Sequence, residues 1–168
     1  VQHQFRMYSL DNSYNFDDLE DWEKRIEKTL NEQVEFVAEL KYDGASISLL
    51  YENGQLIEAV TRGDGFQGDE ITANVRTISD IPMKLHGDFP ENFYIRGEIY
   101  LTKRNFDKIN ERRAEEGLDL FMNPRNTASG SLKIQDSGEV RKRGLSAVLY
   151  QFISNEFPAA THWELIHK

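Results

Sequence analysis

The alternation of apolar and polar residues predicts a chain that mixes amphipathic helices with hairpin-paired strands. Apolar residues recur at steps of three and four between Phe16 and Leu30, which is typical of a helix that packs one face on a core. Asn15 or Asp17 is expected to cap its start. Residues 35–43 alternate with period two instead, and this pattern predicts a strand.

The predicted strand over 35–43 has two different faces. Glu39, Lys41 and Asp43 fall on one of them, and Phe36 and Leu40 fall on the other. Three ionisable side chains are costly to bury without partners. The polar face is therefore expected to line a solvated cleft.

A β-hairpin is predicted next, with strands over 45–51 and 55–62. The Asn53-Gly54 pair between them is a strong hairpin signal because both residues of the tight turn take positive φ. Direct pairing across this turn places Arg62 opposite Ala45. The hairpin would thus return an arginine toward the lysine that ends the preceding strand.

The rest of the chain reads as further helices and strands without an internal repeat or a clear linker. In order, we expect a glycine-rich turn at 63–68, a helix over 69–81, a strand over 92–101, a helix capped by Thr102 that runs to about Glu116, a small-residue loop over 123–133 that has room for a short helix, and a strand over 145–153. This order favours an α+β fold in a single domain over residues 1–168 rather than a doubly wound sheet.

Composition and charge narrow the class of protein. The chain has no cysteine, which excludes a disulfide framework and a thiolate zinc site, and its four histidines lack metal-ligand spacing. It has no apolar run of membrane-spanning length and no signal peptide at its start. We therefore expect a cytoplasmic protein. The net charge is −9, and an acidic domain is expected to bind DNA only weakly by itself.

Lys41 lies in Lys41-Tyr42-Asp43-Gly44, which is the most informative motif of the chain. A lysine can act as a nucleophile when its surroundings lower its pKa and aim it at an electrophile. Taken alone, the motif also fits an exposed strand end followed by a turn.

Two further motifs carry cations next to small residues. Residues 62–65 read Arg-Gly-Asp-Gly, which fits a charged glycine turn or, less well in a chain without cysteine, an adhesion motif. Arg125 and Lys133 flank a run of small residues that would let the backbone approach a phosphate closely. A solvated loop is the alternative interpretation of this second segment.

The order and spacing of these motifs resemble the adenylation domain of bacterial NAD-dependent DNA ligases. The resemblance rests on Ser-Leu-Asp-Asn at 9–12, Lys-Tyr-Asp-Gly at 41–44, Thr-Arg-Gly-Asp-Gly at 61–65, Arg-Gly-Glu at 96–98 and Asn-Pro-Arg-Asn at 123–126. It covers the chain from about Met7 to Phe152. It implies a nucleotidyltransferase core, related to the ATP-grasp architecture, with antiparallel sheets flanked by helices.

The resemblance also implies a role for each motif residue. Lys41 would attack the α-phosphate of NAD, release nicotinamide mononucleotide and carry the adenylate, while Asp43 would orient the lysine or engage a metal. The family positions that contact the nucleotide fall on Ser9, Leu10, Glu39, Arg62, Glu98 and Tyr150, and those near the DNA phosphate fall on Arg125 and Lys133. Many relatives have arginine where this chain has Lys133, and Tyr150 fits a core tyrosine equally well.

The implied partners are NAD, Mg²⁺ and nicked duplex DNA, in DNA replication and repair, with Glu98 near the metal. The sequence has no counterpart of the family's second lysine motif, its zinc finger or its oligonucleotide-binding barrel. We therefore expect a fragment that is inactive or only partly active alone. The whole enzyme would belong to the DNA ligase (NAD⁺) class and work as a monomer. Alternative interpretations are an ATP-dependent nucleotidyltransferase and a non-catalytic nucleotide-binding module.

Overall fold

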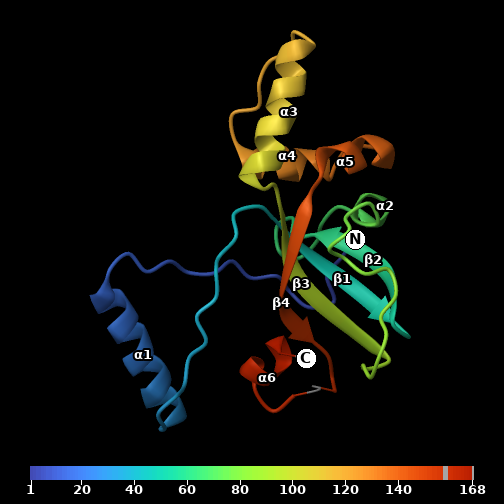
Figure 1. The fold of residues 1–168 in the computed structure, drawn as a ribbon. Coiled ribbons are helices and arrows are strands. Elements are labelled where there is room, and N and C mark those ends of the chain that lie inside the picture. The colour runs from blue at the N-terminus through green and yellow to red at the C-terminus, as the bar shows by residue number, and fades with distance from the viewer. Residues whose placement is uncertain (157–158, 168) are drawn as a thin grey trace. The chain divides into compact units, whose positions relative to one another are not determined.

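The computed structural model describes residues 1–156 and 159–167 and divides into two compact units, Val1–Met7 with Lys41–Lys168, and Tyr8–Leu40. A four-stranded antiparallel sheet with the order β2-β1-β3-β4 organises the larger unit (Figure 1). The strands are β1 (Ala45–Glu52), β2 (Gln55–Thr61), β3 (Asn92–Tyr100) and β4 (Ser146–Ile153). The α+β class is confirmed, although the described residues form one sheet where more than one was expected.

Helices of the larger unit lie mainly toward one end of this sheet, where Figure 1 shows α3, α4 and α5 together. The helices are α2 (Thr72–Val75), α3 (Lys103–Glu115), α4 (Pro124–Ser131), α5 (Ser137–Arg143) and α6 (His162–Ile166), while α1 (Phe16–Leu30) belongs to the smaller unit. None of the helices in the described residues is long and apolar enough to cross a membrane.

The two faces of the sheet have opposite character. Ile47, Leu49 and Tyr51 of β1 are completely or almost completely buried in the hydrophobic core. Ser46 and Ser48 alternate with them and therefore face the other side. The register of β1 and β3 extends this second face into a polar surface, since polar residues of β3 lie opposite both serines.

Most helix caps follow the local sequence. The Asn15 side chain accepts a hydrogen bond from the Asp18 amide at the start of α1, which decides between the two expected caps. Thr102 caps α3 as predicted. The segment over 123–133 contains a true helix, α4, with Asn123 as its cap and proline in its first turn.

The hairpin turn forms as predicted, but the strand register does not. Asn53 and Gly54 both have positive φ, 49° and 72°. A β-bulge on β2 then shifts the pairing by one residue. As a result, the Arg62 amide donates to the Ser46 carbonyl at 2.9 Å, and Arg62 lies at the level of Ser46 rather than Ala45.

The strand predicted over 35–43 is wrong. These residues have no regular secondary structure, and β1 begins only at Ala45. Strands are stable through pairing with a neighbour, and residues 35–43 make none of the strand pairings of the sheet. Glu39, Lys41 and Asp43 therefore do not share a strand face.

The helix predicted over 69–81 is also mostly wrong, because α2 covers only Thr72–Val75. The residues just before it extend along the edge of β2 instead. The Thr61 amide donates to the Asp69 carbonyl at 3.0 Å, and the Ile71 amide donates to the Ala59 carbonyl at 2.8 Å. Pairing with β2 thus uses the Asp69 carbonyl, which would have accepted an intrahelical bond, and satisfies the Ile71 amide, which would have had no partner in the first turn of that helix.

A first prediction concerns alkaline stability. The buried Tyr51 hydroxyl donates to the Pro82 carbonyl at 2.7 Å, and burial raises the pKa of Tyr51 from 10.0 to about 12. A raised pKa gives a stability contribution that is complete below about pH 10 and is lost as the pH rises toward 12. Tyr51→Phe should lower the free energy of unfolding by about 1 kcal/mol at pH 7, through the lost hydrogen bond.

Urea denaturation between pH 7 and 11.5 measures this effect. The difference between the parent chain and Tyr51→Phe should shrink as the pH rises, because phenylalanine does not titrate. Tyr14→Phe, at an exposed tyrosine, serves as the matched control and should run parallel to the parent. A constant difference between the parent and Tyr51→Phe over this range would contradict the prediction.

Candidate functional site

Lys41 is exposed, and the residues that follow it are attached to the sheet and its helices. The Tyr42 ring packs against Tyr100 of β3, with centroids 4.7 Å apart. The Gly44 amide donates to Glu98 Oε1 at 3.2 Å. These contacts hold the backbone next to Lys41 against the end of β3. The Lys41 ammonium group stays accessible to a ligand.

Two ion pairs hold the cations that the sequence suggested for phosphate binding. Arg125 Nη1 lies 3.2 Å from Asp43 Oδ1, so α4 reaches the Lys-Tyr-Asp-Gly segment. Lys133 Nζ lies 2.9 Å from Asp69 Oδ2. All four side chains are more than half exposed, and exposed pairs of this kind contribute only about 0–1 kcal/mol.

The Glu98 carboxylate is the buried acidic group of the site, and both of its oxygens accept hydrogen bonds. Only 9% of the residue is exposed, and its second oxygen accepts a hydrogen bond from Ser46 Oγ at 2.7 Å. The register of β1 and β3 pairs Ser46 directly with Glu98. The sheet therefore brings together donors for a carboxylate that would be costly to bury alone.

Gly44 is the residue that allows this close approach. A Cβ atom at this position would lie 2.1 Å from the Ile99 carbonyl oxygen, far inside van der Waals contact. The Gly44 amide can therefore reach Glu98 only while residue 44 has no side chain.

Tyr150 of β4 joins the same polar face. Burial raises the pKa of Tyr150, and the negative charge of Glu98 raises it further. A hydrogen bond with Ser46 and the positive charges of Arg96 and Arg62 act in the opposite direction. Arg62 and Glu98 are therefore both close enough to Tyr150 for their charges to affect its pKa. Glu98 lies in β3, Tyr150 lies in β4, and Arg62 directly follows β2.

Arg96 is a central residue of this face, although it was not among the expected site residues. Its Nη2 donates to the Phe5 and Arg6 carbonyls at 2.7 and 2.9 Å, and its Nη1 donates to Gln151 at 3.2 Å. Burial lowers its pKa. Its position in the Arg-Gly-Glu motif, two residues before Glu98, was the available signal, because period-two alternation puts both side chains on one face.

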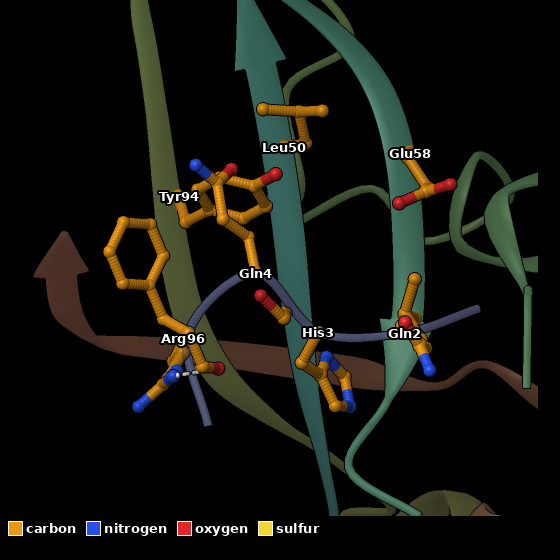
Figure 2. A pocket seen from close by; sticks show the side chains of 10 residues that line it. Gln2, His3, Gln4, Leu50, Glu58, Tyr94 and Arg96 are labelled. Atoms are coloured by element: carbon orange, nitrogen blue, oxygen red, sulfur yellow. Dashed lines mark hydrogen bonds between the residues drawn. The ribbon is translucent and has the colours of Figure 1, made fainter. Parts of the chain in front are cut away.

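The first residues of the chain cross this polar face. Figure 2 shows the segment with Gln2, His3 and Gln4 crossing the strands, and these residues line a pocket together with Leu50 and Glu58. A cavity of about 20 Å³ remains between them and the sheet, which is room for about one water molecule. This segment covers Arg96 and limits access to that part of the sheet.

The glycine turn after β2 is closed by Asp64. Its carboxylate accepts hydrogen bonds from the amides of Phe66 and Gln67, both at 2.9 Å. Both hydrogen bonds lower the pKa of Asp64, and the bond from Gln67 has the larger effect. The contacts match the turn interpretation of the Arg-Gly-Asp-Gly motif.

Ser9, Leu10 and Glu39 belong to the smaller unit, residues 8–40. All three are exposed. Their expected contacts with the nucleotide remain predictions.

Within the described residues, no group of three or more histidine, cysteine, aspartate or glutamate side chains forms a metal site. Both oxygens of Glu98, the expected metal neighbour, accept hydrogen bonds from Gly44 and Ser46. Among the described residues, Glu98 is therefore not part of a metal-binding cluster of side chains.

Comparison with known proteins decides the family. The sequence model described as "NAD-dependent DNA ligase adenylation domain" matches residues 1–168, the whole chain. The chain belongs to this family. It is 57% identical over 169 residues to a DNA ligase of Flavobacterium psychrophilum, 57% over 165 residues to one of Flavobacterium johnsoniae and 42% over 163 residues to one of Cytophaga hutchinsonii.

These relatives are much longer than the chain. The match covers 100%, 98% and 96% of this chain but only 25%, 25% and 24% of the three ligases. The chain thus corresponds to about a quarter of each relative.

A second prediction tests the close approach at Gly44 of this adenylation domain. Gly44→Ala should lower the free energy of unfolding by about 1–3 kcal/mol, because the new Cβ atom must displace the backbone at Ile99. Thermal unfolding measures the change. Gly130→Ala, where a Cβ atom meets nothing within 4 Å, is the control and should be neutral or stabilising. Equal unfolding temperatures for the two variants would contradict the steric argument.

A third prediction concerns the charge of Glu98. Glu98→Gln should lower the pKa of Tyr150, because the change removes a negative charge that raises it. Titration of ¹³Cζ-labelled tyrosine by NMR measures this pKa directly. Glu58→Gln is the control, since Glu58 acts on Tyr94 instead, and it should leave Tyr150 unchanged. An unaltered Tyr150 pKa in Glu98→Gln would show that the two groups are not coupled.

Proposed function

We propose that this chain accepts the adenylate of NAD on Lys41, as the first step of DNA nick sealing by an NAD-dependent ligase. The observation that carries the proposal is the attachment of the Lys-Tyr-Asp-Gly segment to Tyr100, Arg125 and Glu98, in a chain whose whole length matches the NAD-dependent family. The attachment fixes the backbone on one side of the lysine. The exposed side chain keeps room to reach a substrate.

The chemical step is a displacement at phosphorus. The neutral ε-amine of Lys41 attacks the α-phosphorus on the adenosine side of NAD and forms a P–N bond. The P–O bond to nicotinamide mononucleotide breaks and carries its electron pair away with the leaving group. The attacking nitrogen releases a proton to the solvent, and AMP stays on the lysine as a phosphoramidate.

Activation of Lys41 requires loss of its proton, because a lysine at its reference pKa of ~10.4 is almost wholly protonated at neutral pH. Nearby positive charge favours the neutral amine. Arg62 is the candidate among the residues near Glu98 and Tyr150. Asp43, which pairs with Arg125, would orient the segment that carries the lysine.

The polar face next to this segment has the groups that a nucleotide requires. Arg62 offers a guanidinium, Glu98 a carboxylate and Tyr150 a half-buried aromatic ring. We assign these three residues to nucleotide binding, together with Ser9, Leu10 and Glu39 on the strength of the family pattern. Glu39 would accept a hydrogen bond from the adenine amine.

Arg125 and Lys133 are assigned to the phosphate of the DNA nick. Their present partners, Asp43 and Asp69, are held through exposed ion pairs. A phosphate can replace such partners at little cost. Lys133 keeps the positive charge that arginine would supply but lacks its two-pronged hydrogen-bonding geometry.

In the full reaction, the adenylate would pass from Lys41 to the 5′-phosphate at a nick, and the 3′-hydroxyl would then displace AMP. Mg²⁺ would supply charge neutralisation at the phosphates. NAD rather than ATP is the donor that the family match favours.

A fourth prediction tests the nucleophile. A full-length ligase that carries this chain as its adenylation region is mixed with NAD and Mg²⁺ without DNA. Its intact mass should rise by one adenylate, and peptide mapping should locate the adduct on Lys41. Lys41→Ala should abolish the adduct. Lys41→Arg should abolish it as well, because a guanidinium stays charged and cannot attack.

Two other outcomes support the competing functions. An adduct that forms with ATP but not with NAD would indicate an ATP-dependent nucleotidyltransferase. Binding of NAD by the full-length protein, without an adduct from either nucleotide, would indicate a non-catalytic binding module.

Lys28→Gln, on the exposed surface of α1, is the matched lysine control and should keep the full adduct yield.

A further inference from the structure

Positive charge is concentrated in one segment of this acidic chain. Residues 103–143 contain ten lysines and arginines against seven acidic residues, a net charge of +3, whereas the remaining residues contain ten against 22, a net charge of −12. The segment comprises α3, α4 and α5, which Figure 1 shows gathered at one end of the sheet. The larger unit therefore has a basic end.

A cluster of guanidinium groups lies within this basic end. The guanidinium carbon of Arg113 lies 4.2 Å from the centre of the Phe121 ring, and that of Arg143 lies 5.0 Å from it. Arg112 joins them, since its Nη2 donates to the Lys142 carbonyl at 3.1 Å. We call Arg112, Arg113, Phe121 and Arg143 the Phe121 cluster.

The last turns of two helices supply these arginines. Arg112 and Arg113 lie in the last turn of α3, and Arg143 lies in the last turn of α5. The C-terminal end of a helix carries a partial negative charge that favours cations. The two helix ends thus help to hold like charges close together.

No carboxylate within the described ranges lies at ion-pair distance from the three arginines. The nearby Glu139 pairs with Lys142 instead. Burial lowers the pKa of Arg143, and the positive charges of Arg113 and Arg112 lower it further, which shows that the three cations repel one another. The negative charge of Glu139 partly opposes this effect. An anion from outside the chain would relieve this repulsion.

A cavity lies directly beside the cluster. Its volume is about 330 Å³, and Phe121 and Arg143 form part of its lining. Asn126 and Thr127 of α4 also line it, and Arg125 precedes them in the same helix. The Phe121 cluster and the N-terminal part of α4, which carries Arg125, therefore lie beside the same cavity.

We propose that the Phe121 cluster binds backbone phosphates of duplex DNA, at a second contact beside the one made by Arg125 and Lys133. The proposal rests on the proposed ligase function. A polyanion fits better than a single small anion, because the positive charge extends over three helices. Arginine also presents the donor geometry that matches phosphate oxygens in pairs. With a net charge of −12 elsewhere, DNA would be repelled from most other surfaces of the chain.

The test uses the double variant Arg113→Gln and Arg143→Gln in a full-length ligase that carries this chain. Affinity for a nicked duplex is measured by fluorescence anisotropy at several salt concentrations. The slope of log affinity against log salt should become shallower by about 1 for each phosphate that the variant no longer neutralises, that is by about 1–2. Affinity at low salt should fall several-fold, while self-adenylation by NAD without DNA should stay at the parent level.

Two further variants make the result specific to the cluster. Lys28→Gln with Lys84→Gln removes the same charge at positions elsewhere in the chain and should keep the parent slope. Arg113→Lys with Arg143→Lys keeps the charge and should restore the slope, with only part of the affinity because the paired donors are removed. A purely structural role for the arginines would instead lower the unfolding temperature without changing the slope.

The outcomes separate this inference from the proposed function. Parent slope and affinity in the folded glutamine variant would overturn the inference, whatever the adenylation result. Equal loss in the Lys28→Gln, Lys84→Gln control would also overturn it, because the effect would then come from net charge. If the parent protein binds nicked DNA through the cluster but forms no adenylate, the proposed nucleophile fails and the role of the cluster in DNA binding stands.

Discussion

The hydrogen bonds of one buried carboxylate determine how the lysine motif joins the sheet. Glu98 accepts from the Gly44 amide and the Ser46 hydroxyl, so the residues just after Lys41 are attached to β3 rather than only to their own strand. A buried carboxylate without donors would be strongly unfavourable. The Glu98 carboxylate therefore requires two features of the fold. One is the register that pairs Ser46 with Glu98, and the other is the absence of a side chain at Gly44. Any change that moves β1 along β3 would also move the segment that carries Lys41.

This constraint explains why a small sheet can have a polar face that is largely covered. Arg96 and Glu98 are both buried on that face, with opposite charges two residues apart. Arg96 uses the carbonyls of Phe5 and Arg6 as acceptors, and Glu98 accepts from Gly44 and Ser46 instead. The first residues of the chain thus act as part of the polar face, and they separate the two charged groups into distinct hydrogen-bonding networks.

Local signals in the sequence predicted the elements that local interactions decide. The α1 and α3 helices and the Asn53-Gly54 turn follow from spacing, caps and positive φ. The α4 helix could have been predicted more firmly, since Asn123 followed by proline is a helix start. The failures over 35–43 and 69–81, and the one-residue error at Arg62, depend on which backbone groups find a partner strand. Alternation of residues carries no information about that choice.

The site shows the same division. The family resemblance singled out Arg62, Glu98 and Tyr150, and the structure brings these three close enough for the charges of Arg62 and Glu98 to affect the pKa of Tyr150. Ser46 was missed because a serine inside a strand has no distinctive local pattern. Arg96 lies in the Arg-Gly-Glu motif, but its role depends on the Phe5 and Arg6 carbonyls, which are far away along the chain. The same reasoning applies to the Phe121 cluster, in which α3 and α5 contribute arginines about 30 positions apart. If nucleotide chemistry occupies the polar face of the sheet and DNA is held by the basic helices, Arg125 is the residue that links the two, because its ion pair with Asp43 is weak enough for a DNA phosphate to take its place.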